Sequence, residues 1–227
     1  MNEPGLDPIV RISIHGEKRL STLNLVKGTT VYGERLVRHK GEEYRVWDPF
    51  RSKLAGALEN GLSWLPLESR SRVLYLGAST GTTVSHISDI IGVNGVIFAV
   101  ESSSRVGREL LQKVASKREN IVPILEDARR PNLYFSILGT VDIVYCDIAQ
   151  PDQTDIALKN CHQYLKPDGA LILIVKTRSI DVVKNPRSVI DQEAKKLEAN
   201  QFIINQIINL EPFDRDHALI SARYEAA

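Results

Sequence analysis

The sequence is poor in the residues that mark secreted and membrane-spanning proteins. Its 227 residues include only two cysteines, which excludes a disulfide-stabilised framework and fits an intracellular protein. The longest apolar runs, such as residues 96–100 and 171–175, are far shorter than the roughly 20 residues that cross a membrane. Residues 1–8 lack the basic and apolar segments of an export signal. We therefore expect an intracellular protein that does not contact a membrane.

An excess of charge of one sign is also missing. Lysine and arginine total 29 against 28 acidic residues, so the formal net charge is only +1. A chain with this balance does not bind a polyanion strongly by itself, so an RNA ligand would have to be held partly by other proteins. The histidines show no spacing typical of zinc ligands, and we expect no metal site.

The chain divides into a small β-rich module, residues 1–50, and a larger domain, residues 51–227. In the module, strand-like pieces at residues 9–15, 22–26, 30–32 and 44–47 are broken by turn residues, including Lys40-Gly41-Glu42. Residues 52–60 then have helical spacing, with Leu54 and Leu58 on one face.

After residue 69, apolar strands alternate with helices. The expected strands are residues 72–77, 95–100, 121–124, 141–146 and 170–175, and the expected helices are residues 82–91, 105–116, 153–165 and 186–199. Parallel strands buried on both faces explain the solid apolar runs, and the helices supply the crossovers. The pattern predicts a doubly wound α/β sheet.

The end of the chain indicates which kind of α/β sheet this is. Two strand-like runs, residues 202–210 and 218–224, are separated by a segment too short for a crossover helix, so they should pair antiparallel. A Rossmann-like seven-stranded sheet that closes in an antiparallel hairpin is the class I methyltransferase variant of the nucleotide-binding architecture. Dehydrogenases usually lack this hairpin.

A loop rich in glycine and threonine follows the first strand of that sheet. Gly77 and Gly81 allow the backbone to pass close to a ligand, while the hydroxyls of Thr80, Thr82 and Thr83 can cap the next helix or bind the ligand. The Gly-x-x-x-Gly spacing matches neither a dinucleotide fingerprint nor a P-loop. A tight turn without a ligand therefore remains an alternative.

Two acidic residues follow the next two strands. Glu101 could accept both hydroxyls of a ribose, and Asp127, with Ala128 beside it, could accept a hydrogen bond from an adenine amino group. Ligands in open α/β sheets bind beyond the carboxyl ends of the strands, so these residues and the glycine loop predict one nucleoside pocket. Plain exposed acids are the alternative.

The last two parallel strands end at Asp147 and Lys176, which should lie side by side near the transferred methyl group. An ammonium can stabilise the alkoxide that develops when a ribose hydroxyl attacks, and a carboxylate can hold that ammonium in place. His217 could transfer protons near neutral pH, and Lys53 could line the same cleft. Ordinary surface ion pairs and solvated side chains compete with this interpretation.

Several segments together resemble the fibrillarin family, and the resemblance covers nearly the whole chain. They are Tyr32-Gly-Glu-Arg35, Tyr44-Arg-Val-Trp-Asp-Pro-Phe-Arg-Ser-Lys-Leu54, Leu76-Gly-Ala-Ser-Thr-Gly-Thr-Thr-Val-Ser-His86, Asp147-Ile-Ala-Gln150, Lys176-Thr-Arg-Ser-Ile-Asp181 and Asp216-His-Ala218.

The resemblance implies a binding site for S-adenosyl-L-methionine and a catalytic set of four residues. The implied cofactor contacts, together with the glycine loop, are Gly77, Ala78, Gly81, Thr82, Thr83, Glu101, Ser102, Asp127, Ala128, Asp147, Ile148, Ala149 and Gln150. The implied catalytic set is Lys53, Asp147, Lys176 and His217. Ser102 departs from the family, which often has an aromatic residue there, so stacking on the cofactor should be weaker.

The resemblance also implies partners. Family members methylate pre-rRNA and, in archaea, tRNA inside a box C/D guide-RNA particle that contains a Nop-family scaffold protein and a kink-turn-binding ribosomal-type protein. The archaeal members of the family lack a Gly/Arg-rich N-terminal tail, and residues 1–8 of this chain do not resemble such a tail. The resemblance therefore implies a cytoplasmic protein. The alternatives are a methyltransferase with another acceptor, a non-catalytic particle subunit and a nicotinamide dehydrogenase.

Overall fold

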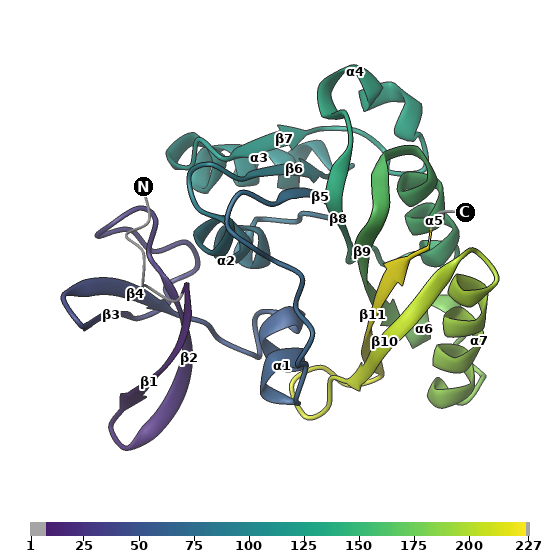
Figure 1. Ribbon diagram of the computed structural model, residues 1–227. Coiled ribbons are helices and arrows are strands. Elements are labelled where there is room, and N and C mark those ends of the chain that lie inside the picture. Colours follow the sequence, from purple (N-terminus) through teal and green to yellow (C-terminus); the bar gives the residue numbers. More distant parts are fainter. Residues whose placement is uncertain (1–7, 226–227) are drawn as a thin grey trace.

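Two sheets organise the chain in the computed structural model, which describes residues 8–225 (Figure 1). The small sheet is antiparallel, with the strand order β1-β2-β4-β3. Its strands are β1 (Ile9–Ile14), β2 (Glu17–Leu23), β3 (Leu36–His39) and β4 (Glu42–Val46). Residues 1–7, on which the export prediction mainly rests, lie outside the described residues.

The small sheet differs from the prediction in the bounds of β2 and in the presence of β3. The turn at Lys40 and Gly41 is confirmed, with φ of +50° and +86° at these two residues. The strand predicted at residues 22–26 overlaps β2 only at Thr22 and Leu23, residues 30–32 form no strand, and β3 was not predicted. Between β2 and β3, the Asn24 side chain bonds the backbone of Val26 and Thr29, and the Glu34 carboxylate accepts the Val31 amide. Such local bonds replace the ladder bonds of a strand.

The large sheet has seven strands in the order β10-β11-β9-β8-β5-β6-β7. The strands are β5 (Arg72–Leu76), β6 (Val96–Val100), β7 (Ile121–Ile124), β8 (Val141–Cys146), β9 (Leu165–Lys176), β10 (Phe202–Asn209) and β11 (His217–Tyr224). Strands β5 to β9 run parallel, while β11 pairs antiparallel with both β9 and β10. The predicted seven-stranded sheet with a final antiparallel hairpin is confirmed.

Helices cover both faces of the large sheet. They are α1 (Lys53–Glu59), α2 (Thr82–Ile91), α3 (Ser104–Lys113), α4 (Phe135–Leu138), α5 (Gln153–Tyr164), α6 (Thr177–Ile180) and α7 (Pro186–Glu198). Alternate strand residues face opposite layers: Tyr75 packs into the core with α1, α2 and α3, while Leu76 packs with α5 and α7. None of the helices in the described part of the chain is long and apolar enough to span a membrane. The one-turn helices α4 and α6 were not predicted.

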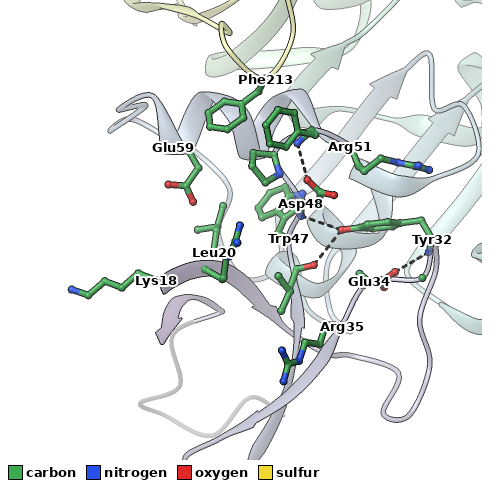
Figure 2. Close-up of a pocket in the computed structure, with 15 residues that line it drawn as sticks. Lys18, Leu20, Tyr32, Glu34, Arg35, Trp47, Asp48, Arg51, Glu59 and Phe213 are labelled. Atoms are coloured by element: carbon green, nitrogen blue, oxygen red, sulfur yellow. Dashed lines mark hydrogen bonds between the residues drawn. The ribbon is translucent and has the colours of Figure 1, made fainter. Parts of the chain in front are cut away.

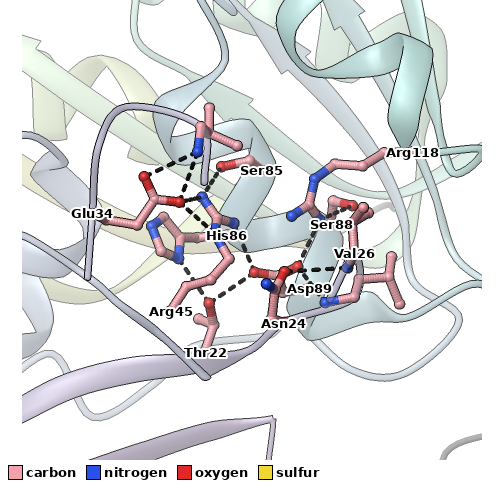
Figure 3. Close-up of polar contacts among 12 residues, drawn as sticks. Thr22, Asn24, Val26, Glu34, Arg45, Ser85, His86, Ser88, Asp89 and Arg118 are labelled. Carbon is pink, nitrogen blue, oxygen red and sulfur yellow. Dashed lines mark hydrogen bonds and ion pairs between the residues drawn. The ribbon is translucent and has the colours of Figure 1, made fainter. Parts of the chain in front are cut away.

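A buried ionic cluster attaches the small sheet to α2 (Figure 3). The Asp89 carboxylate on α2 lies between two guanidinium groups, 2.8 Å from Arg45 of β4 and 2.6 Å from Arg118. It also accepts a hydrogen bond from the Thr22 hydroxyl of β2 at 2.9 Å. Arg45 is fully buried and its other partner is the buried Glu34 carboxylate at 2.6 Å. All these charges are paired, as buried charges must be.

His86 forms the second part of this junction. Its Nδ1 lies 2.8 Å from the Thr22 hydroxyl, its Nε2 lies 2.8 Å from the Tyr32 hydroxyl, and its ring stacks on Trp47 at 4.7 Å. Thr22, Tyr32 and Trp47 all precede α1, whereas His86 belongs to α2. The small sheet is therefore fixed to the helix that begins directly after the glycine loop.

His86 predicts a pH dependence of stability. Burial, followed by the nearby Arg45 and Arg118, lowers the pKa of His86 well below its ordinary value of 6.5. Below about pH 6.5 the unfolded chain therefore binds a proton that the folded protein does not, so the free energy of unfolding falls by about 1.4 kcal/mol per pH unit. We expect His86→Gln to have a smaller loss of stability between about pH 7.5 and about pH 5.5, measured by urea denaturation.

The exposed His162 provides the control for this measurement. His162→Gln should keep the pH dependence of the wild type. If His86→Gln lost as much stability as the wild type over the same pH interval, His86 would not be the group responsible.

Candidate active site

An ion pair joins the carboxyl ends of two neighbouring parallel strands. Asp147 follows β8 and Lys176 ends β9. The Lys176 Nζ lies 2.7 Å from Asp147 Oδ1 and donates a hydrogen bond to the Asp147 backbone oxygen at 3.0 Å. The buried Gln153 side chain bonds the Ile174 carbonyl and the Lys176 amide, which fixes the end of β9. The structure thus brings together the two residues that the sequence places at adjacent strand ends.

Lys53 approaches the same carboxylate from the other side. It begins α1, and its Nζ lies 3.3 Å from Asp147 Oδ2 and 3.7 Å from Asp214 Oδ2. Asp214 belongs to the loop between β10 and β11 and was not predicted as a site residue. Lys53 therefore connects the strand ends to the final hairpin.

His217 completes the arrangement at the first position of β11, opposite Lys176 in the strand register. Its Nδ1 lies 3.0 Å from Asp214 Oδ1 and 2.6 Å from the Arg215 carbonyl oxygen. A carbonyl oxygen can only accept, so Nδ1 carries the hydrogen and, in the neutral ring, Nε2 is the basic nitrogen.

Together these five side chains form a row in which basic and acidic groups alternate. We call it the charged row: Lys176, Asp147, Lys53, Asp214 and His217. Each cationic group has a carboxylate within 4 Å, which holds two ammonium groups close to one another without leaving either unpaired.

The glycine loop lies directly beside Asp147. Gly77 has a φ of +81°, and a Cβ at this position would be 2.7 Å from the Asp147 backbone oxygen. Only glycine tolerates both the backbone conformation and the close approach. A ligand on this loop would therefore lie next to the charged row.

Gly81 and Thr83 also make contacts within the protein. A Cβ at Gly81 would contact Leu110 at 2.7 Å, so this glycine allows α2 and α3 to pack closely. The predicted capping by threonine is wrong, because α2 begins after Gly81 with no side-chain cap. Thr83 instead bonds the buried Ser52 hydroxyl at 2.9 Å, which ties α2 to the residue before Lys53.

A cavity of about 230 Å³ opens at the carboxyl ends of β5 to β8. At its edge, the Glu101 carboxylate accepts the Ser79 amide on one oxygen and the Ser103 amide on the other, both at 2.9 Å. These two bonds fix the orientation of the carboxylate, and each of its oxygens can accept one more hydrogen bond. The group is therefore prepared to accept a pair of vicinal hydroxyls.

Asp127 lines the same cavity at the end of the neighbouring strand β7. Its carboxylate accepts the Arg129 amide at 2.9 Å, and the Arg129 guanidinium donates to the Gln150 side-chain oxygen at 2.9 Å. Arg129 therefore connects the segment after β7 with the segment after β8. It was not predicted as a site residue; its signals in the sequence are the basic pair that it forms with Arg130 and its position two residues after Asp127.

Nine of the thirteen predicted cofactor contacts line this cavity: Gly77, Glu101, Ser102, Asp127, Ala128, Asp147, Ile148, Ala149 and Gln150. The other four do not line it: Ala78, Gly81, Thr82 and Thr83. Ser79 and Glu126 line it although they were not predicted. The donors and acceptors suit a nucleoside. Within the described residues, no group of three or more His, Cys, Asp or Glu could hold a metal ion.

Comparison with known proteins gives one family. The family model described as fibrillarin matches residues 7–226. A protein from Saccharolobus islandicus named fibrillarin-like rRNA/tRNA 2′-O-methyltransferase is 54% identical over 210 residues, which is 92% of this chain and 90% of that protein.

Two solved structures show the same fold over most of their length. Fibrillarin from Aeropyrum pernix, crystallised with natively bound S-adenosyl-L-methionine, has a TM-score of 0.86 and 47% identity, covering 94% of this chain and 92% of that one. A fibrillarin in complex with Nop5p has a TM-score of 0.86 and 39% identity, covering 97% of this chain and 98% of that one.

Proposed function

Because the chain belongs to the fibrillarin family, we propose that it transfers methyl groups from S-adenosyl-L-methionine to ribose 2′-hydroxyls of rRNA and tRNA. The observation that carries this proposal is the charged row beside the nucleoside cavity, with Lys176 Nζ 2.7 Å from Asp147 Oδ1. An oriented ammonium at the edge of a cofactor cavity is suited to a reaction in which a hydroxyl becomes negatively charged.

The residues of the cavity fit S-adenosyl-L-methionine. Gly77 allows the loop after β5 to lie against the Asp147 backbone at the cavity wall, and the oriented Glu101 carboxylate suits the two ribose hydroxyls. Asp127, which lines the cavity after the neighbouring strand β7, is available to the adenine amino group. When bound, the cofactor supplies an electrophilic methyl group on a positively charged sulfur.

The chain's own residues activate and orient the attacking hydroxyl. The Lys176 ammonium stabilises the negative charge that develops on the 2′-oxygen, and Asp147 fixes the ammonium in place. Lys53 adds positive charge to the same centre. The basic Nε2 of His217 accepts the proton, while Asp214 and the Arg215 carbonyl hold its Nδ1.

The proposed setting is a box C/D guide-RNA particle. The fibrillarin solved with Nop5p supports a Nop-family scaffold protein as a partner. We further propose that a guide RNA selects the target nucleotide and that a kink-turn-binding ribosomal-type protein completes the particle. The net charge of +1 agrees with an enzyme that relies on partners to hold RNA.

We propose the cytoplasm as the location, where the two free cysteines stay reduced.

Reconstitution tests the proposed function. The chain is combined with a guide RNA, a Nop-family scaffold protein, a kink-turn-binding protein and a target RNA, and methyl-labelled S-adenosyl-L-methionine is added. We expect label on one ribose 2′-oxygen, at the nucleotide that the guide specifies. Label on a base or on protein would show a different acceptor, and no label would contradict the activity.

Glu101→Ala should weaken cofactor binding by about 1–3 kcal/mol, because the ribose loses two charge-assisted hydrogen bonds. The substitution also frees the Ser79 amide, which the carboxylate now holds. Calorimetric titration with S-adenosylhomocysteine measures the effect. The control is Glu109→Ala, which removes an exposed carboxylate paired with Lys113 and should leave the affinity unchanged. Equal affinities for Glu101→Ala and the wild type would place the ribose elsewhere.

A further inference from the structure

A cavity of about 640 Å³ shares no lining residue with the cofactor cavity. Figure 2 shows the residues that line it. It is bounded by the small sheet, by residues 47–51 that lead into α1, and by Phe213 in the loop between β10 and β11. No residue of the charged row lines it. The proposed chemistry therefore does not account for this cavity.

The cavity nevertheless reaches the reaction centre. A smaller hollow of about 60 Å³ is lined by Phe50, Arg51 and Phe213, which also line the large cavity, and by Lys53 and Asp214 of the charged row. Phe50 lies three residues before Lys53, so their Cα atoms are at most about 11 Å apart. A ligand in the cavity would therefore be close to the group being methylated.

The wall nearest the reaction centre offers aromatic surface to solvent. The Phe50 side chain is 67% exposed, yet it is held in position because its ring meets Phe213 edge to face at 5.1 Å and its amide bonds Asp48. Gly56 leaves room for the Phe213 ring, since a Cβ there would lie 3.2 Å from Phe213 Cβ. An ordered, exposed ring is suited to stacking with another planar group.

The rest of the wall is positively charged. Arg51 and Lys18 have no carboxylate partner among the described residues, and Arg35 contacts only the ring of His15. Three acids line the cavity: Glu34 is paired with Arg45 and Glu59 with Arg11, while Asp48 accepts the Phe50 amide and has no ion pair among the described residues. The three cations without a carboxylate partner, Lys18, Arg35 and Arg51, outnumber this one acid. The free charge of the cavity is thus positive, and it favours an anion.

A buried hydrogen-bond donor also lines the cavity without a partner. Trp47 is 1% exposed, and its indole Nε1 has no acceptor among the described residues. The ring is fixed by stacking on His86. The fixed Trp47 ring is therefore a rigid part of the cavity wall.

We propose that this cavity binds one unstacked nucleotide of the target RNA, next to the nucleotide that is methylated. The base packs against Phe50 and Phe213, and its phosphate lies near Arg51 and Arg35. A planar face combined with an anion is characteristic of a nucleotide. An acidic protein segment would also pair with the cations, but it would leave the aromatic wall without a planar group to stack on it. The inference rests on the proposed function, since it assigns a subsite to the RNA substrate.

Replacing Phe50 tests the stacking contact in the assembled particle. Phe50→Ala is expected to lower kcat/KM for the target RNA by about 5- to 150-fold, which is the range for losing one base–aromatic contact. Phe50→Trp, which keeps an aromatic ring, should restore most of it. The control is Phe135→Ala, since Phe135 is similarly exposed at 63% but lies on α4. S-adenosylhomocysteine titration checks that each variant keeps its cofactor site.

Crosslinking tests occupancy independently of catalysis. Target RNA that carries 4-thiouridine beside the methylated position is irradiated in the particle, and the crosslinked peptides are identified. We expect crosslinks to residues 47–51 or 213. Crosslinks only elsewhere, with methylation intact and Phe50→Ala as active as the wild type, would overturn the subsite alone. Crosslinks to RNA without any methyl transfer would overturn the proposed function alone.

Discussion

Lys176→Ala is expected to slow methyl transfer by at least ~10²-fold in the assembled particle, the usual cost of losing one preorganised group that stabilises transition-state charge. The Lys176 ammonium is ion-paired at 2.7 Å with Asp147, so it is already oriented before the substrate arrives. Alanine leaves no cation at the end of β9. The measurement is the single-turnover rate with saturating cofactor and RNA, which separates the chemical step from binding.

The control for this prediction is Lys184→Ala. Lys184 is an exposed lysine in the loop before α7, 3.6 Å from Asp181, and we expect its removal to leave the rate unchanged. Particle assembly with the scaffold protein and guide RNA should be intact for both variants. A rate for Lys176→Ala close to that of Lys184→Ala would remove Lys176 from the mechanism, even if the particle methylates RNA.

The reaction centre could be predicted from the sequence because it depends on sheet topology. Asp147 and Lys176 each follow a buried apolar strand, and adjacent parallel strands end at the same edge of a sheet. Asp214 could not be found this way, since it lies in a loop whose path depends on how the final hairpin packs against α1. Its only sequence signal is its position three residues before His217.

The predictions failed where side chains compete with backbone pairing. Thr83 was expected to face the cofactor or cap α2, but its hydroxyl forms a hydrogen bond with the buried Ser52 hydroxyl across the interface with α1. In the small sheet, Asn24 and Glu34 bond nearby backbone groups and turn the chain where strands were expected. Both outcomes depend on partners that local hydrophobic patterns do not reveal.

The junction between the small sheet and α2 should be the part of the fold most sensitive to a single substitution. We expect Asp89→Asn to lower the free energy of unfolding by about 3–5 kcal/mol, as for other buried ion pairs that lose one partner. The Asp89 oxygens accept from Arg45, Arg118, Thr22 and the Leu25 amide. Asparagine has similar volume but no charge, and its amide nitrogen would face one of these donors.

Urea denaturation of the free protein measures this effect, and Asp155→Asn is the matched control. Asp155 pairs with Lys196 at 3.0 Å, but its side chain is half exposed, so its loss should cost at most about 1 kcal/mol. A comparable, small loss for both variants would mean that Arg45 and Arg118 are solvated when Asp89 is neutral.

The expected large loss of stability in Asp89→Asn should also affect the reaction centre. Lys53 lies seven residues after the end of the small sheet, and the preceding Ser52 bonds Thr83 of α2, so a loosened junction should slow methyl transfer as well.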